Sequence, residues 1–157
     1  MKIGIIGSFK QYFDEIVDLK TKLQKLGHEI TNPSGNMLTK SHVDFVRTDF
    51  DNINCADWEI QTEVFYKLFA SDFVYVLVIN NYIGKTTSYE VGRLIQRKIP
   101  LFFSDQPNDL PILVPEVNIL DPIRLFGDLE KGISLIPLFS SYENEYEEME
   151  NRLIFPI

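Results

Sequence analysis

The sequence predicts an α/β fold with a parallel sheet of about five strands, the usual size for this architecture. Three observations support it. Residues 73–79, FVYVLVI, form an unbroken apolar run, which suits a strand buried on both faces. Residues 2–7, KIGIIG, form a second apolar run at the N-terminus. Helical patterns alternate with these runs, and such alternation is typical of a doubly wound, flavodoxin-like three-layer sandwich.

The N-terminal part of the chain reads as a strand–helix–strand unit. After the first strand, a helical pattern of apolar residues runs from Phe13 to Leu26, and Gly27 is a natural C-cap. Residues 28–31 are predicted to form a short strand, followed by a loop at 32–36. The unit has the usual length for such a motif, so we expect its two strands to be parallel and its connection to be right-handed.

The middle of the chain is less regular. Residues 37–55 mix charged and aromatic side chains without a clear period, and we predict no element there. A helix is predicted at about 56–70, ahead of the central strand at 73–79. A second helix at 87–98 and a short strand at 100–103 follow.

The last third begins with a proline-rich loop at 104–115. Residues 117–120 are predicted to form a fifth strand and residues 122–131 a helix. A further helix is expected at 140–152, before an apolar tail at 153–157. With no internal repeat or linker in view, we assign residues 1–157 to one domain.

Composition and charge narrow the function classes. The net charge of −8 argues against a nucleic acid polymer as partner, and an acidic helix face at 143–150 accounts for much of it. No apolar run is long enough for a membrane span, and the N-terminus lacks the layout of a signal peptide. The single cysteine, Cys55, suits a reducing compartment. We therefore expect a cytoplasmic protein without a membrane partner.

Several common sites are disfavoured by the motifs. No G-x-G-x-x-G fingerprint follows the first strand, no Walker motif is present, and Ser8 lacks the context of a nucleophile elbow. His28 and His42 are isolated, and no Cys/His cluster suggests a metal. We expect neither a cofactor nor a metal ion.

Polar residues gather where two of the predicted strands end. Gly7, Ser8 and Phe9 follow the first strand, and residues 80–90 follow the central one. The carboxyl ends of neighbouring parallel strands share one edge of the sheet, and open α/β sheets bind ligands there. Gly7 would let the backbone approach a ligand closely.

The start of the helix after the central strand is the richest part of this edge. Free amides there, with Thr86, Thr87 and Ser88, can hold a phosphate, a sugar hydroxyl or a carboxylate. Gly84 lies in the turn itself, and Tyr82 has a ring that could stack on a base or simply pack. The aromatic residues of the preceding helix are interpreted as core rather than as a stacking platform: Trp58, Phe65, Tyr66 and Phe69.

Glu90 is the candidate catalytic group. It lies in the first turn of the helix, beside the apolar stripe that contains Val91 and Leu94. Partial burial and the helix N-terminus act on its pKa in opposite directions, which suits a nucleophile or a base. A structural interpretation is equally open. Thr87 and Glu90 have the spacing of a capping box, in which both would serve only to begin the helix.

Five short stretches occur in the order GIIGS (4–8), ASD (70–72), NYIGKTT (81–87), YEVG (89–92) and KIPL (98–101). Together they resemble the nucleoside 2-deoxyribosyltransferase superfamily, which includes the deoxynucleoside-monophosphate N-glycosidases. The resemblance spans residues 2–103. In that family a glutamate in a Y-E-x-G setting attacks the anomeric carbon of a deoxyribosyl group.

The resemblance implies a role for several residues. It makes Glu90 the nucleophile and assigns sugar or phosphate contacts to Ser8 and to the turn at 84–88. The family also carries a proton-handling aspartate on the helix before the central strand, and there Glu63 is the nearest substitute. From the residues themselves, the group that protonates the leaving base stays open among Glu63, Glu59, Asp57, Asp51 and a water.

These observations lead to two expectations for function. The first is cleavage of an N-glycosidic bond, or base transfer, on a (deoxy)nucleoside or its monophosphate. The alternative is a non-catalytic nucleotide sensor of the same fold, since Lys85 would hold a phosphate electrostatically. A weaker echo is the P-G-G-x-G-T-x-x-E run of the Lonely guy phosphoribohydrolases. The nucleoside 2-deoxyribosyltransferase superfamily commonly completes its pocket with the chain terminus of a neighbouring subunit. The resemblance and the apolar tail at 153–157 therefore favour a homo-oligomer.

Overall fold

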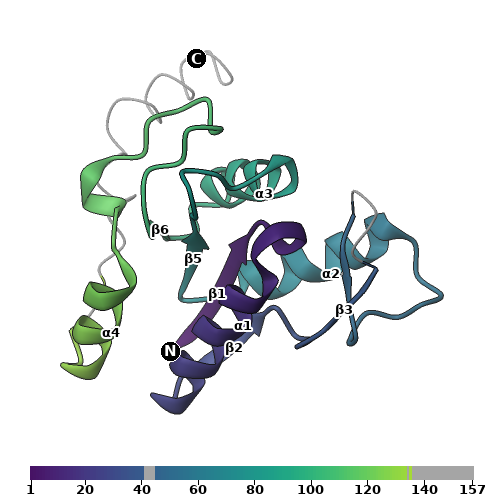
Figure 1. Ribbon diagram of the computed structural model, residues 1–157, viewed down its shortest axis with the longest axis horizontal. Helices are drawn as coiled ribbons and strands as arrows, with labels where there is room; N and C mark the ends of the chain where they lie inside the picture. Colours follow the sequence, from purple (N-terminus) through teal and green to yellow (C-terminus); the bar gives the residue numbers. More distant parts are fainter. Residues whose placement is uncertain (41–44, 134, 136–157) are drawn as a thin grey trace, which may run out of the picture.

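The computed structural model describes residues 1–40, 45–133 and 135, and these form an α/β fold around a parallel sheet (Figure 1). The sheet has four strands in the order β2-β1-β5-β6. Their bounds are β1 Lys2–Gly7, β2 Glu29–Asn32, β5 Phe73–Leu77 and β6 Leu101–Phe103. The helices are α1 Phe9–Lys25, α2 Asp57–Phe69, α3 Lys85–Gln96 and α4 Pro122–Glu130.

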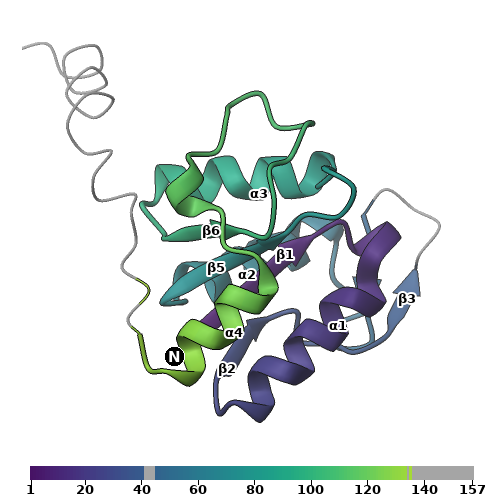
Figure 2. The ribbon, with the colours of Figure 1, turned by 60° about the vertical axis from the view of Figure 1, so that its left-hand side comes forward.

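Two apolar cores lie on opposite faces of this sheet (Figure 2). On one face, Ile3 and Ile5 of β1 pack with the apolar stripes of α1 and α4. On the other face, Ile6 of β1 and Val76 of β5 pack with α2 and α3. Every residue of β5 is buried, as the continuous apolar run predicts for a central parallel strand.

The register of β1 and β5 determines where a ligand site can form. Gly7 pairs with Leu77, so both strands end at the same level. The strand order also reverses here, because β2 lies on one side of β1 and β5 on the other. The helices that follow β1 and β5 therefore start side by side and cover opposite faces, which leaves a crevice between their N-termini.

Two sequence predictions are corrected by this architecture. The predicted strand at 117–120 is wrong: Glu116–Asn118 is a 3-10 turn, and Ile119 makes a single parallel bridge to Phe103. The reason is that the side chain of Asn118, rather than its backbone, donates to the carbonyl oxygen of Leu101 at the sheet edge (3.0 Å).

The second correction is in the irregular segment 37–55, where no element was predicted. It contains a short antiparallel hairpin of β3 Leu38–Lys40 and β4 Arg47–Thr48. Strands of two or three residues are too short to show a period in the sequence. In Figure 1 the hairpin projects beside α2.

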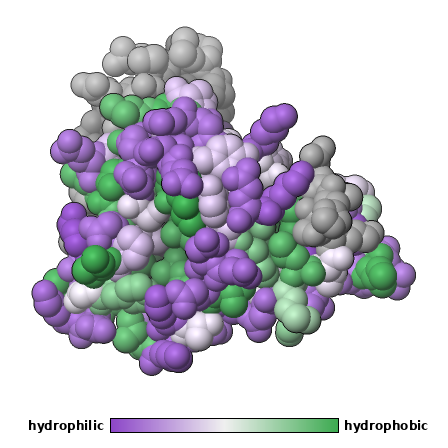
Figure 3. Space-filling model, viewed as in Figure 1, coloured by the Kyte–Doolittle hydropathy of each residue, from purple (hydrophilic) through white to green (hydrophobic). Residues whose placement is uncertain are grey.

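The other elements predicted within the described residues are confirmed to within a few residues, including the helix at 122–131. No helix of the described residues is long and apolar enough to cross a membrane. Hydrophilic side chains spread over the face seen in Figure 3, with apolar ones between them. The expected helix at 140–152, its acidic face at 143–150 and the tail at 153–157 lie outside the described residues.

Gly7 has a structural role that a substitution would reveal. A Cβ atom at this position would lie 2.9 Å from the backbone oxygen of Leu77, and a backbone oxygen in a central strand cannot move away cheaply. We expect Gly7→Ala to lower the free energy of unfolding by roughly 1–3 kcal/mol, the usual cost of overpacking a core. Urea denaturation measures it.

Gly127→Ala is the matched control, since it lies in α4 with no atom within 4 Å of the added Cβ. This variant is expected to gain up to about 1 kcal/mol from helix propensity. Equal stabilities for Gly7→Ala and the wild type would contradict the close packing of β1 on β5.

Candidate functional site

A cavity of about 370 Å³ lies at the carboxyl edge of the sheet. The end of β1 and the first turn of α1 form one part of its wall, and the start of α3 forms another. The loop after β2, the hairpin region and one face of α2 complete the lining. The crevice predicted from the two strand ends is therefore a real cavity, but it has more walls than those two.

Glu90 lies in this wall with its side chain withdrawn from solvent, at 8% exposure. The Nε2 of Gln61, from α2, donates a hydrogen bond to its Oε1 at 3.1 Å. Burial raises the pKa of Glu90 from its ordinary 4.5 to about 7, although the bond from Gln61 opposes this rise. Near neutral pH both protonation states are populated, so the group can serve as nucleophile, base or acid.

The capping-box interpretation of Thr87 and Glu90 is wrong. Helix α3 begins at Lys85, two residues before the predicted start, with Gly84 as its N-cap. Thr87 is thus inside the first turn and only 2% exposed, and no side chain caps the helix. Glu90 bonds across to α2 instead, which makes it part of the cavity rather than of a helix cap.

A rigid turn delivers the chain from β5 to this helix. Asn80 and Asn81 both have positive φ, at 53° and 56°, and Ile79 bridges Tyr82, as in the tight turns of β-hairpins. The carboxylate of Asp109 then accepts from the amides of Ile83 (3.0 Å) and Gly84 (2.8 Å). This anchoring fixes the start of α3 against the loop after β6.

The electrostatics of the cavity favour an anion. The first turns of α1 and α3 carry no acidic residue, and their amides lack intrahelical acceptors, so both helix ends present positive potential. At α3 the carboxylate of Asp109, which accepts from the Gly84 amide just before this turn, offsets part of that potential. Lys10, Lys67 and Lys85 also line the wall. Against them stand two carboxyl groups, Glu90 and Asp51, and the first of these is only partly ionised near pH 7.

The residues predicted to bind substrate mostly meet at this cavity. Those that line it are Gly7, Ser8, Phe9, Tyr82, Gly84, Thr86 and Thr87. Ser88 does not, because its hydroxyl donates to the backbone oxygen of Gly84 at 2.8 Å. We expected Gly7 to make room for a ligand. In the structure, the space that a side chain would need at this position is occupied by the neighbouring strand β5.

Glu63, the predicted second catalytic residue, lies outside the cavity wall. Its side chain is 65% exposed and pairs with Lys67 at 3.0 Å along the outside of α2. The positions of α2 that do face the cavity are Ile60, Gln61, Val64 and Lys67. A solvent-exposed carboxylate that pairs with Lys67 and does not line the cavity is not placed to protonate a leaving group inside, so we drop Glu63 from the site.

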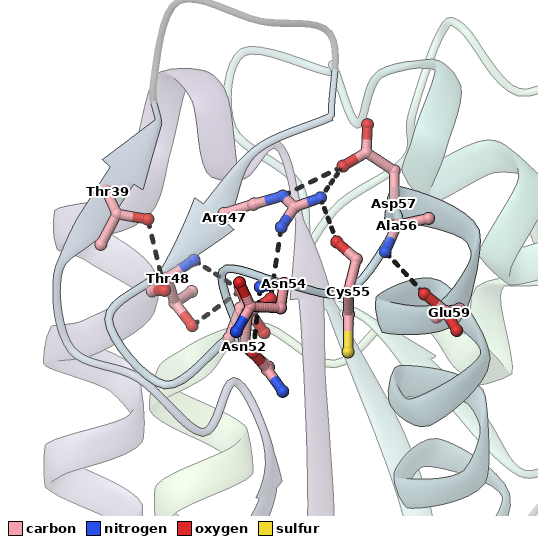
Figure 4. Close-up of polar contacts among 10 residues, drawn as sticks. Thr39, Arg47, Thr48, Asn52, Asn54, Cys55, Ala56, Asp57 and Glu59 are labelled. Carbon is pink, nitrogen blue, oxygen red and sulfur yellow. Dashed lines mark hydrogen bonds and ion pairs between the residues drawn. The ribbon is translucent and has the colours of Figure 1, made fainter.

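Of the other proton donors considered from the sequence, only Asp51 lines the cavity. Its Oδ2 accepts from the backbone amide (2.6 Å) and hydroxyl (3.0 Å) of Thr48. Asp57 instead pairs with Arg47, and the carboxylate of Glu59 accepts from the amide of Ala56 at 2.7 Å (Figure 4).

Three polar residues of the site were not predicted from the sequence: Gln61, Asp109 and Lys67. Gln61 is spaced one helical turn from Val64, a signal that would have placed it on the inner face of α2. Asp109 lies in a proline-rich loop that offers no such signal. Lys67 donates a hydrogen bond to the hydroxyl of Ser34, in the loop after β2, at 3.0 Å. The buried Lys20 of α1 donates to the backbone oxygen of the same serine, also at 3.0 Å.

The aromatic residues of α2 divide in a way the sequence did not predict. Phe65 is core, at 5% exposure, as expected. Trp58 and Tyr66 are instead 71% and 77% exposed, so their assignment to the core is wrong. Trp58 lies in the first turn of α2, next to the rim of the cavity.

Removing the Asp109 carboxylate should loosen the start of α3. In Asp109→Ala, the amides of Ile83 and Gly84 lose their acceptor, and we expect their hydrogen exchange to become faster by about tenfold, from bonds worth about 1 kcal/mol or more. Asp105→Ala is the control, because that exposed carboxylate accepts a hydrogen bond from the neighbouring amide of Gln106 and not from the start of α3. Unchanged exchange at both amides would contradict the anchoring.

Comparison of the chain with models of protein families, with curated proteins and with solved structures found no match. Within the described part of the chain, no group of three or more His, Cys, Asp and Glu residues could hold a metal ion. The case for function therefore rests on the cavity, on Glu90 and on the resemblance of the sequence.

Proposed function

We propose that this protein cleaves the N-glycosidic bond of a (deoxy)nucleoside or nucleoside monophosphate, or transfers its base, with Glu90 as nucleophile. The observation that carries the proposal is a withdrawn carboxyl group in the wall of a cavity between two helix N-termini. The strand order β2-β1-β5-β6 is compatible with a flavodoxin-like fold and so with the family that the sequence resembles.

The chemistry follows from the properties of the carboxylate. As the C1–N bond breaks, its electron pair leaves with the base and positive charge develops on the sugar, as in glycoside hydrolysis. The ionised Glu90 stabilises this charge and then forms an ester bond to C1. Attack by water on C1 releases a free sugar, whereas attack by a second base gives an exchanged nucleoside, and both reactions return the carboxylate.

The departing base needs a proton. Among the described residues that line the cavity, Asp51 is the one carboxyl group besides Glu90. Its Oδ2 already accepts two hydrogen bonds from Thr48, which hold the carboxylate in place to orient a water. We therefore assign the proton to a water in the cavity, positioned in part by Asp51.

The charge distribution favours a monophosphate over a free nucleoside. A phosphate fits the helix N-termini, where backbone amides and the dipole both favour an anion. Lys10 and Lys85 belong to the same two helix starts and add point charges. The sugar would then extend from the phosphate toward Glu90, one turn further along α3.

A panel of substrates tests the proposal. The full chain is incubated with the common ribo- and deoxyribonucleosides and their 5′-monophosphates, with and without an acceptor base, and free or exchanged base is measured by chromatography. We expect release from at least one deoxynucleoside monophosphate, at a higher rate than from the matching nucleoside. If no compound releases or exchanges its base, the catalytic proposal fails.

The second candidate is a nucleotide sensor that binds without turnover. It is favoured by the position of Glu63, which leaves the cavity without the acid that the resemblance implies. Under this reading, a nucleotide raises the melting temperature of the protein while no product forms over hours. The same panel, followed by thermal shift, separates the two candidates.

A further inference from the structure

A second, shallower groove of about 340 Å³ opens beside the cavity. Phe45, Gln61, Lys85 and Thr86 line both, so the two spaces adjoin each other. Beyond these shared residues, the groove is formed mainly by two aromatic side chains, Trp58 of α2 and Tyr89 of α3.

Both aromatic side chains are open to solvent and, unlike the exposed Tyr66 of α2, both line the groove. Trp58 is 71% exposed and Tyr89 is 53% exposed. A large aromatic surface gains free energy when another flat ring covers it, and stacking on such faces accepts any nucleobase. Two exposed rings at the mouth of a polar cavity are therefore better explained by a planar ligand than by the fold, which does not bury them.

The supports of both rings are held in place before any ligand arrives. Beside Trp58, Asp57 accepts from Nε of Arg47 (3.0 Å), and that guanidinium also donates to the backbone oxygen of Cys55 (2.9 Å) (Figure 4). These bonds tie the start of α2 to the hairpin. The hydroxyl of Tyr89 accepts from Arg93 at 2.9 Å, and its ring packs edge-on against Phe65. Little ordering entropy is then left to lose on binding.

We propose that this groove binds the nucleobase of the substrate, with Trp58 and Tyr89 as its stacking faces. The inference rests on the proposed function, because it assigns the leaving group of that reaction. Gln61 lines both spaces and donates to Glu90, so a base in the groove lies next to the carboxyl group that attacks the anomeric carbon. The phosphate and sugar then occupy the deeper cavity.

Trp58 is the one tryptophan of the chain, and it can therefore report on the groove directly. Its fluorescence is followed while the four deoxynucleoside monophosphates, or deoxyribose 5-phosphate, are titrated into the full chain. The Glu90→Gln background is used so that no ligand is consumed. We expect quenching by the nucleotides and none by the sugar phosphate, which lacks a base.

Calorimetry with variants gives the matching affinities. Trp58→Ala is expected to weaken nucleotide binding by about 5-fold to 100-fold, the range for losing one stacking face, and to leave sugar phosphate binding unchanged. Trp58→Phe should restore most of the loss. Tyr66→Ala is the control, since this equally exposed ring of α2 lines neither space.

Different results would overturn the base-binding groove and the proposed reaction. If nucleotides and sugar phosphate both bind, but Trp58→Ala binds nucleotides as the wild type does and no quenching occurs, the base lies elsewhere and only this inference is overturned. If neither ligand binds the wild type or the Glu90→Gln protein, the proposed function is overturned and the inference falls with it.

Discussion

Glu90→Gln is expected to lower the rate of base release by at least about a thousandfold, the scale of losing a catalytic nucleophile or base. The amide oxygen of glutamine can still accept the bond from Gln61, and the side chain has nearly the same volume, so the cavity keeps its shape. What is lost is the negative charge that stabilises the sugar cation and the oxygen that forms the ester. Initial rates of base release measure the effect.

The pH dependence adds a signature specific to this residue. Because the ionised form acts as nucleophile, kcat/KM of the wild type should rise with pH through an apparent pKa of about 7. Glu15→Gln, which changes an exposed glutamate outside the cavity, is the control and should keep the wild-type rate. A Glu90→Gln variant that retains its activity would remove Glu90 from the mechanism.

The same substitution is expected to stabilise the protein at alkaline pH. Below pH 4.5 the carboxyl group of Glu90 is protonated in the folded and unfolded chains, and the wild type and variant should be about equally stable. As the pH rises toward 7, the unfolded chain releases this proton while the folded chain keeps it, so the wild type loses stability. Above pH 7 the loss is complete, at about 3 kcal/mol.

Glutamine at this position carries no such cost. The free energy of unfolding of Glu90→Gln should therefore match the wild type near pH 4 and exceed it by about 3 kcal/mol at pH 8. Denaturation in urea at both pH values gives the comparison, and Glu15→Gln should show no such divergence. A variant that is no more stable than the wild type at pH 8 would mean that Glu90 is not withdrawn from water.

Much of this site could be predicted because strand ends and helix starts carry strong sequence signals. The apolar run at 73–79 and the turn after it were enough to place Gly84, Thr86 and Glu90 at the ligand edge of the sheet. The exact start of α3 was not predictable by the same reasoning. Gly84 has a φ of +88° and is the N-cap, so the helix begins two residues before the predicted start. The sequence pointed to a later start because Thr87 and Glu90 have the spacing of a capping box.

The parts that could not be predicted depend on contacts between distant segments. Asp109 holds the start of α3 from a loop 25 residues away, and no local pattern marks it. Gln61 and Glu63 are two residues apart in α2. Which of them faces Glu90 depends on how this helix is turned about its axis in the fold. Trp58 was predicted to lie in the core because it is a large aromatic residue of α2. Its exposure depends on how the start of α2 is held against the hairpin by the pair of Arg47 and Asp57.

Trapping the covalent intermediate shows whether Glu90 is the nucleophile. The wild type and Glu90→Gln are mixed with the deoxynucleoside monophosphate that releases its base fastest, quenched in acid, and examined by intact-protein and peptide mass spectrometry. We expect a deoxyribosyl phosphate adduct on the peptide that contains Glu90 in the wild type, and none in the variant. Base release with an adduct on another residue, or without any adduct during rapid turnover, would contradict the assignment of Glu90 as the nucleophile.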